Sequence, residues 1–117
     1  MAQPYLVRLS EIILRLDPNP SGVELTCKHF FGGAALYAGG KICASLSPAG
    51  FAVKLPEKVR RQLLSERKGR KFRYFASGPI KREYLALSRS VVSDPKVLRE
   101  LLAASIKYVV AFASSRD

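Results

Sequence analysis

The sequence predicts a single α+β domain with two layers, in which helices pack on an antiparallel sheet. Apolar residues recur at helical spacing near both ends of the chain, short alternating runs lie between them, and glycine-rich turns separate those runs. With 117 residues, the chain can bury a stable core without disulfides or metal ions. The expected order is a helix, about three or four strands, a short helix, two strands and a long helix.

A helix is predicted from Pro4 to Leu16, because its apolar side chains repeat at helical spacing. The turn formers of residues 17–22 end that helix, since each X-Pro step disfavours helical geometry in the preceding residue. A first strand follows, in which alternate residues share one face: Val23, Leu25, Cys27 and His29.

Two Gly-Gly pairs punctuate the segment from His29 to Leu55. Glycine adopts positive φ at no steric cost, and the second pair separates two apolar runs at the spacing of a hairpin. Antiparallel strands are therefore predicted around Ala34–Ala38, Lys41–Ser47 and Phe51–Leu55.

Pro56 is expected to open a short helix that buries Val59, Leu63 and Leu64, with Gly69 as the left-handed residue just past its end. Alternation then predicts a strand over 72–76 and another over 84–88. Ser93 or Asp94 should cap the last helix, with Pro95 in its first turn. Its apolar stripe faces the sheet: Val97, Leu98, Leu101, Leu102, Ile106, Val109, Val110 and Ala113.

The net charge of +11 is distributed unevenly. Residues 54–82 hold 11 of the 20 basic residues and only two acidic ones, Glu57 and Glu66. A surface this basic attracts polyanions without requiring sequence readout or catalysis. The predicted partner-facing surface consists of Lys58, Arg60, Arg61, Arg67, Lys68, Arg70 and Lys71.

A phosphate-binding loop is excluded at Gly39-Gly40-Lys41, because that motif requires glycine at position 35 and Ser or Thr at position 42, where this chain has Ala35 and Ile42. Cys27, His29 and Cys43 form an alternative metal or nucleophile site, if Cys43 approaches from another strand. Buried free cysteines are common in protein cores, which favours a structural role for both thiols.

Direct nucleic-acid binding is another alternative, since aromatic residues are interleaved with basic ones near Phe72. Strand alternation points Phe72 and Tyr74 into the core, so this alternative depends mainly on charge. The apolar surplus of the last helix and the second face of the sheet favour a homodimer.

The two cysteines lack CxxC spacing, which favours a reducing cytoplasm over a secreted disulfide scaffold. The first residues lack the features of a signal peptide, and the uncharged stretches are too short to span a membrane. A soluble cytoplasmic protein is therefore expected.

The string from Phe31 to Tyr37, followed by Gly40, Ala44 and the strand that ends at Lys54, resembles the N-terminal domain of the TfoX/Sxy family. The resemblance covers about residues 5 to 113. The positions that carry it are Phe31, Gly32, Gly33, Leu36, Tyr37, Gly40, Lys54, Phe72, Tyr74, Tyr84, Asp94 and Pro95. Ala35 replaces a glycine of many members, and residues after Lys54 are more basic than is usual in the family.

The resemblance implies a fold like that of secretion chaperones, often dimeric, and a role in regulating bacterial competence genes alongside the cyclic-AMP receptor protein. No catalytic residue or cofactor is implied. The expected function is a non-enzymatic regulatory or interaction domain in a single-domain chain of residues 1–117, because the chain leaves no room for the second domain of the full-length regulators.

Overall fold

The computed structural model describes residues 3–19, 22–30, 32–73 and 77–116, with side chains described from residue 4 to residue 111 of these ranges. Phe31 and Tyr74 lie outside the described residues. Within the described part, the elements are α1 (Gln3–Leu16), β1 (Leu25–Phe30), β2 (Gly33–Ala38), β3 (Lys41–Ser47), β4 (Gly50–Lys54), α2 (Glu57–Ser65), β5 (Gly69–Lys71), β6 (Tyr84–Leu87), α3 (Arg89–Val92) and α4 (Pro95–Arg116). The predicted α+β class is confirmed.

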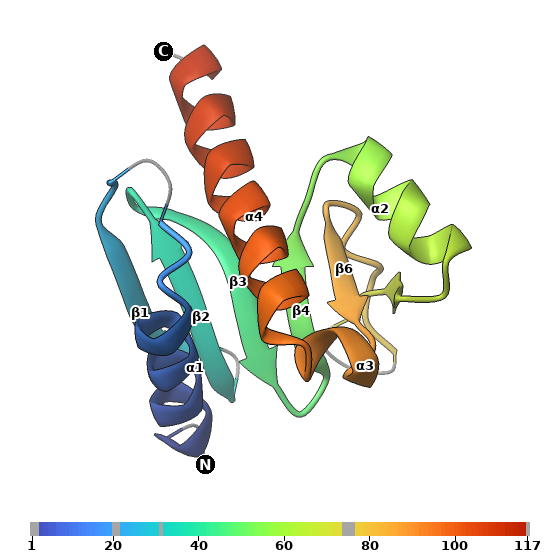
Figure 1. Cartoon of the computed structure of the whole chain (residues 1–117), viewed down its shortest axis with the longest axis horizontal. Coiled ribbons are helices and arrows are strands. Elements are labelled where there is room, and N and C mark those ends of the chain that lie inside the picture. Colours follow the sequence, from blue (N-terminus) through green and yellow to red (C-terminus); the bar gives the residue numbers. More distant parts are fainter. Residues whose placement is uncertain (1–2, 20–21, 31, 74–76, 117) are drawn as a thin grey trace.

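The six strands form one antiparallel sheet in the order β1-β2-β3-β4-β6-β5. The first four are neighbours in sequence and join through short turns. β6 inserts between β4 and β5, so the last strand in sequence is not the last in space. Figure 1 shows α4 crossing one face of this sheet, with α1 beside it over β1 and β2 and α2 near the β6 end.

The main core lies between the helices and one sheet face, because the apolar stripes of the helices need this surface to leave water. α4 contributes the buried Leu98, Leu102 and Ile106, and α1 contributes Leu9. These side chains meet the alternate residues of the central strands that point to the same face: Leu36, Ala44, Leu46, Phe51, Val53 and Leu85.

Polar contacts fix the ends of the two long helices. Arg99 Nε of α4 donates to the carbonyl of Leu16 at 2.8 Å, which satisfies an acceptor at the α1 C-terminus. Asp94 Oδ1 accepts a hydrogen bond from Val97 N at 3.3 Å and so caps α4, as predicted. Within the described residues, none of the helices combines the length and the apolar character needed to cross a membrane.

The opposite sheet face has a narrow row of small side chains. Ala35, Ser45, Ala52 and Ala86 are successive register partners on β2, β3, β4 and β6, and each is at most 1% exposed. A second buried cluster adjoins this row, where the rings of Phe72 and Tyr84 lie 5.8 Å apart.

The structure corrects the predicted end of the short helix. Arg67, not Gly69, has the left-handed conformation, with φ of 58°. The N–H groups of Arg67 and Lys68 donate to the carbonyls of Leu64 and Leu63, the hydrogen-bond pattern of a Schellman motif. Gly69 instead opens β5, where a Cβ would collide with the side chain of Leu85.

The strand predicted over 72–76 was also misplaced. β5 covers residues 69–71, because these are the residues that pair with β6, and Phe72 follows it as buried irregular backbone. Tyr74 and Ala76 lie outside the described residues. The sequence prediction also missed α3, a single turn that Ser88 caps by accepting from Val91 N.

Gly39 and Gly40 form the β2–β3 turn with φ values of 57° and 83°, as a type I′ hairpin requires. Gly33 needs glycine for another reason. A Cβ there would meet the carbonyl oxygen of Leu46 and lie 2.7 Å from Ser47 Cβ, so β3 approaches too closely for a side chain.

Replacing Gly33 by Ala should destabilise the protein by about 3 kcal/mol, because backbone atoms of β3 must move to make room. Gly39→Ala is the matched control, since it has open space around it and adds only the cost of a left-handed Ala, about 1 kcal/mol. Urea unfolding followed by circular dichroism measures both losses. Equal losses in the two variants would contradict the steric explanation.

Candidate anion-binding site

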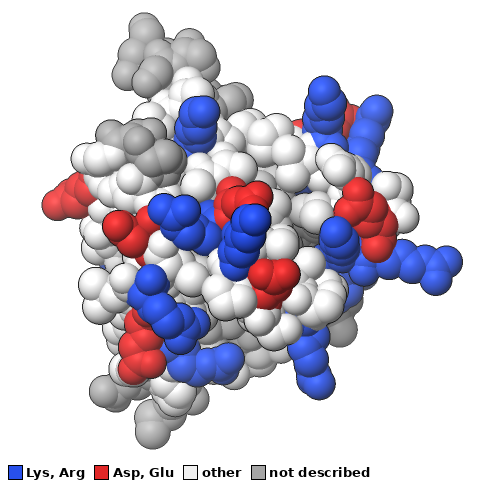
Figure 2. Space-filling model, in the orientation of Figure 1, with Lys and Arg blue, Asp and Glu red and all other residues white. Residues whose placement is uncertain are grey.

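α2 presents a strongly basic surface at one side of the molecule. Val59 and Leu63 of this helix pack on the main core, so its charged residues occupy the remaining faces. Figure 2 shows Lys and Arg side chains projecting along this edge, with a few acidic side chains among them. The strands and loop that follow α2 add further basic residues.

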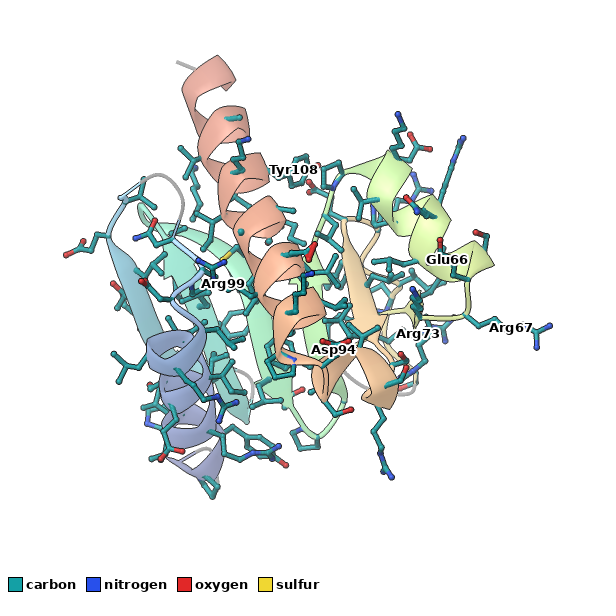
Figure 3. The ribbon with its side chains drawn as sticks, in the orientation of Figure 1. Glu66, Arg67, Arg73, Asp94, Arg99 and Tyr108 are labelled. Carbon is teal, nitrogen blue, oxygen red and sulfur yellow. The ribbon has the colours of Figure 1, made fainter. Side chains whose placement is uncertain are left out.

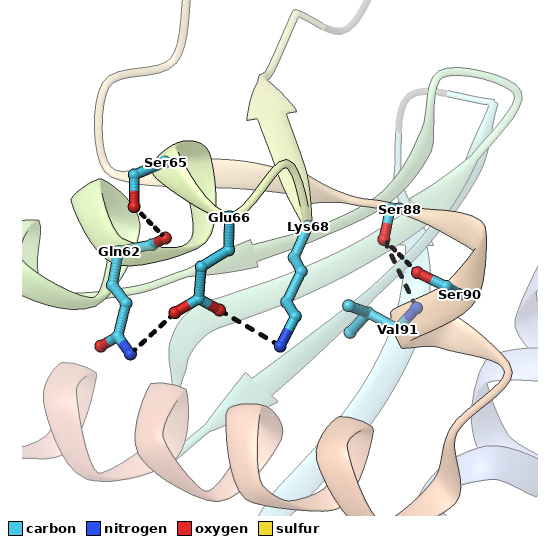
Figure 4. Close-up of polar contacts among 7 residues, drawn as sticks. All are labelled: Gln62, Ser65, Glu66, Lys68, Ser88, Ser90 and Val91. Atoms are coloured by element: carbon cyan, nitrogen blue, oxygen red, sulfur yellow. Dashed lines mark hydrogen bonds and ion pairs between the residues drawn. The ribbon is translucent and has the colours of Figure 1, made fainter.

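Local acidic residues pair with some of these cations. Arg61 contacts Glu57 at 2.9 Å, and Lys68 contacts Glu66 at 3.1 Å. Gln62 also donates to Glu66, as Figure 4 shows, and these contacts lower the pKa of the Glu66 carboxyl. Both ion pairs are exposed, so they organise the surface more than they stabilise the fold.

A cleft of about 800 Å³ opens beside α2 and is bounded by β5, β6 and, between these strands, Arg73 and residues 78–82. We refer to it as the α2 cleft. Among its lining residues, one is acidic, Glu57, and six are basic. The basic residues are Arg60, Arg61, Lys71, Arg73, Lys81 and Arg82. This excess of positive charge in a concave site concentrates anions near the surface.

The cleft also has an apolar part. Leu64 is 36% exposed, so the prediction that the short helix buries it is wrong, and Ile80 is 41% exposed. Pro79, Tyr84 and Leu85 also line this part of the cleft. Leu64 and Ile80 are two of the four large apolar side chains that are exposed in the described part of the chain. The α2 cleft therefore combines cations with accessible apolar surface, which is typical of ligand sites.

Arg60 lies at the inner side of α2, half-buried, and its Nε atom is buried without a hydrogen-bond partner. The positive charge of Arg60 acts on Tyr108 of α4, whose hydroxyl donates to Glu83 at 2.9 Å. Burial and this contact with Glu83 raise the pKa of Tyr108, while Arg60 opposes the increase. Figure 3 shows Tyr108 on the side of α4 that faces α2.

The seven basic residues singled out in the sequence do not form one continuous patch. Arg60, Arg61 and Lys71 line the α2 cleft. Arg67 projects away from the molecule, as Figure 3 shows. Arg70 reaches the other sheet face and donates to the carbonyl of Ala49 at 3.3 Å, because neighbouring residues of a strand point to opposite faces.

The remaining two members lie outside the cleft: Lys58 is exposed on α2 and Lys68 pairs with Glu66. Conversely, the sequence interpretation did not include Arg73, Lys81 and Arg82, which line the cleft. These three residues lie inside the basic segment of residues 54–82. Their position beside α2 depends on the pairing of β5 with β6, which brings both ends of the segment between these strands close to the helix.

Several residues that carry the family resemblance contribute to the turns, the core and the surface of the sheet. Gly32 lies in the β1–β2 turn with φ of 73°, and Leu36 is fully buried. Two tyrosine rings on the sheet make cation–π contacts with lysines. Lys28 Nζ lies 5.4 Å from the centre of the Tyr37 ring, and Lys54 Nζ lies 5.5 Å from the centre of the Tyr84 ring.

The alternative site at Cys27, His29 and Cys43 does not come together. Among the described residues, no three His, Cys, Asp or Glu side chains are grouped to hold a metal ion. Cys43 is fully buried, and its Sγ donates to the Leu36 carbonyl at 3.5 Å. Burial raises the pKa of the Cys43 thiol to about 12, which opposes formation of a nucleophilic thiolate.

In a Cys27→Ser variant, the Cys43 thiol should resist a disulfide reagent at about pH 8, because the raised pKa keeps it protonated and burial denies access. The same variant should react rapidly once guanidinium unfolds it. The absorbance of the released thiolate measures both rates. Rapid labelling of the folded variant would contradict this account.

Comparison with known proteins yields one family match. The family model for the TfoX N-terminal domain matches residues 21–109, which include the whole sheet, α2 and most of α4. A search of curated proteins found no significant relative. The family match agrees with the resemblance carried by the glycine-rich strands, and the chain belongs to the TfoX N-terminal domain family.

Proposed function

We propose that this protein is a non-enzymatic regulatory domain that acts by binding an acidic partner through the basic surface around α2. The observation that supports this proposal most is the α2 cleft, whose lining includes six basic residues and only one acidic residue. Family membership supports a role in the transcriptional regulation of competence genes. Two free cysteines support a cytoplasmic location.

An acidic segment of a regulatory protein is the first candidate partner. Complementary charge accelerates association and orients the two surfaces, even where exposed ion pairs add little affinity. Direct binding of nucleic acid is the second candidate, favoured by the same excess of cations. Stacking adds little support, because Phe72 is 1% exposed and Tyr84 is 9% exposed.

Fluorescence anisotropy with labelled polyglutamate, duplex DNA, single-stranded DNA and RNA distinguishes the two candidates. The protein should bind at least one of these probes at about 50 mM salt, and log affinity for a nucleic acid should fall linearly with log salt. Preference for polyglutamate supports a protein partner, and preference for a nucleic acid supports the second candidate. No binding to any probe would refute the proposed function.

Charge reversal tests whether position matters and not only net charge. A variant with Arg61→Glu, Lys71→Glu, Arg73→Glu and Arg82→Glu should bind the preferred probe at least about tenfold more weakly, because repulsion replaces attraction in the α2 cleft that these residues line. The control reverses four exposed cations elsewhere, at Arg8, Lys41, Lys96 and Lys107, and so has the same net charge. Equal weakening in both variants would show that binding depends on total charge alone.

We further propose that the protein forms a homodimer. Val7 and Leu14 lie seven positions apart on α1 and are 49% and 82% exposed, so they offer an apolar contact surface. Light scattering should give twice the 12.9 kDa of one chain. Leu14→Glu should return the mass to one chain, while Leu64→Glu in the α2 cleft should not. A wild-type mass of one chain would exclude the dimer.

A further inference from the structure

We infer that the α2 cleft binds a nucleotide, taken up either free or as the 5′-phosphorylated end of a nucleic-acid strand. The shared chemistry is a phosphate group on the 5′-oxygen of a sugar that carries a planar aromatic base. This inference rests on the proposed function and makes it more specific, since it assigns one ligand class to the cleft within the basic surface.

The size of the cleft favours a ligand larger than a simple anion. Its volume of about 800 Å³ falls in the range of sites that hold drug-sized molecules, about 300–1,000 Å³. Inorganic phosphate would occupy a small part of this space and leave the apolar lining in contact with water. A nucleotide fills both the charged and the apolar parts.

The basic lining suits phosphate in particular. Four of the six cations are arginines: Arg60, Arg61, Arg73 and Arg82. A guanidinium group donates two parallel hydrogen bonds to phosphate oxygens, a geometry that a lysine ammonium does not offer. The arginines come from α2 and from both ends of the segment between β5 and β6, so they approach a ligand from two sides.

Arg60 independently indicates that the cleft lacks a hydrogen-bond acceptor that a bound ligand could provide. Its Nε atom is buried, yet no hydrogen-bond partner satisfies it. Buried donors are almost always paired in folded proteins, because an unpaired one loses its hydration without compensation. A phosphate oxygen at the inner wall of the cleft gives this side chain an acceptor when the guanidinium turns toward the ligand.

The apolar residues indicate where the base would lie. Leu64 on α2 and Ile80 on the opposite wall leave large side chains in contact with water inside a cationic cleft. A base packed between these side chains removes apolar surface from water while its phosphates remain near the arginines. A ligand with charge alone would gain nothing from this part of the site.

Isothermal titration calorimetry of the full chain with ATP, tripolyphosphate and adenosine tests this division of roles. ATP should bind at least about tenfold more tightly than tripolyphosphate, which has the same number of phosphates but no base to bury, and adenosine should bind most weakly. Ile80→Ala should weaken ATP binding by about fivefold and leave tripolyphosphate binding unchanged. Equal affinities for ATP and tripolyphosphate would overturn the inference.

A second pair of variants tests the position of the phosphates. Arg60→Gln with Arg82→Gln should weaken ATP binding by at least about tenfold, because both arginines line the cleft. The control, Arg67→Gln with Arg70→Gln, removes the same charge outside the cleft and should change the affinity by less than about twofold. Equal losses in the two variants would also overturn the inference.

Two oligothymidylates, one with a 5′-phosphate and one with a 5′-hydroxyl, distinguish the sources of the nucleotide. Tighter binding of the phosphorylated strand than of ATP assigns the cleft to strand ends, whereas indifference to the 5′-phosphate with tight ATP binding assigns it to free nucleotides. If ATP and the phosphorylated strand both fail to bind while polyglutamate or duplex DNA still binds, the nucleotide site is refuted and the proposed function stands.

Discussion

The burial of one face of the central strands under α1 and α4 is the interaction on which the rest of the molecule depends. Leu36, Leu46 and Val53 on the sheet meet Leu102 and Ile106 on α4, and all are nearly or fully buried. Burial of such apolar side chains is the dominant favourable contribution to folding. The sheet can therefore support a small additional unit at its far end, formed by α2, β5 and β6, which holds the α2 cleft.

The cleft differs from the core in the way its surface is used. The main core buries its apolar residues almost completely, whereas Leu64 and Ile80 stay exposed in a cleft that is lined by six basic residues. Such an arrangement leaves apolar surface in contact with water and gathers positive charge in one place. Regions of this kind in proteins are commonly those that bind a partner or a ligand.

Local sequence patterns predicted most of the elements, since helical spacing and glycine-marked turns are properties of neighbouring residues. They were accurate for β2 to β4, which follow one another in both sequence and space. They failed for β5, because its position is fixed by pairing with β6, more than ten residues further along the chain, and by the close approach that Gly69 permits. The same limit applies to the site, where the segment before β6 brings Arg82 to α2.

The insertion of β6 between β4 and β5 has a consequence for synthesis of the protein. While the ribosome extends the chain, β1 to β4 can pair in turn, because each partner has just emerged. β5 has no such partner, since its neighbour is made later, and its three residues cannot persist as an isolated strand. The basic segment around α2 therefore emerges before the strand that gives it shape, and the α2 cleft is completed only after β6 has emerged.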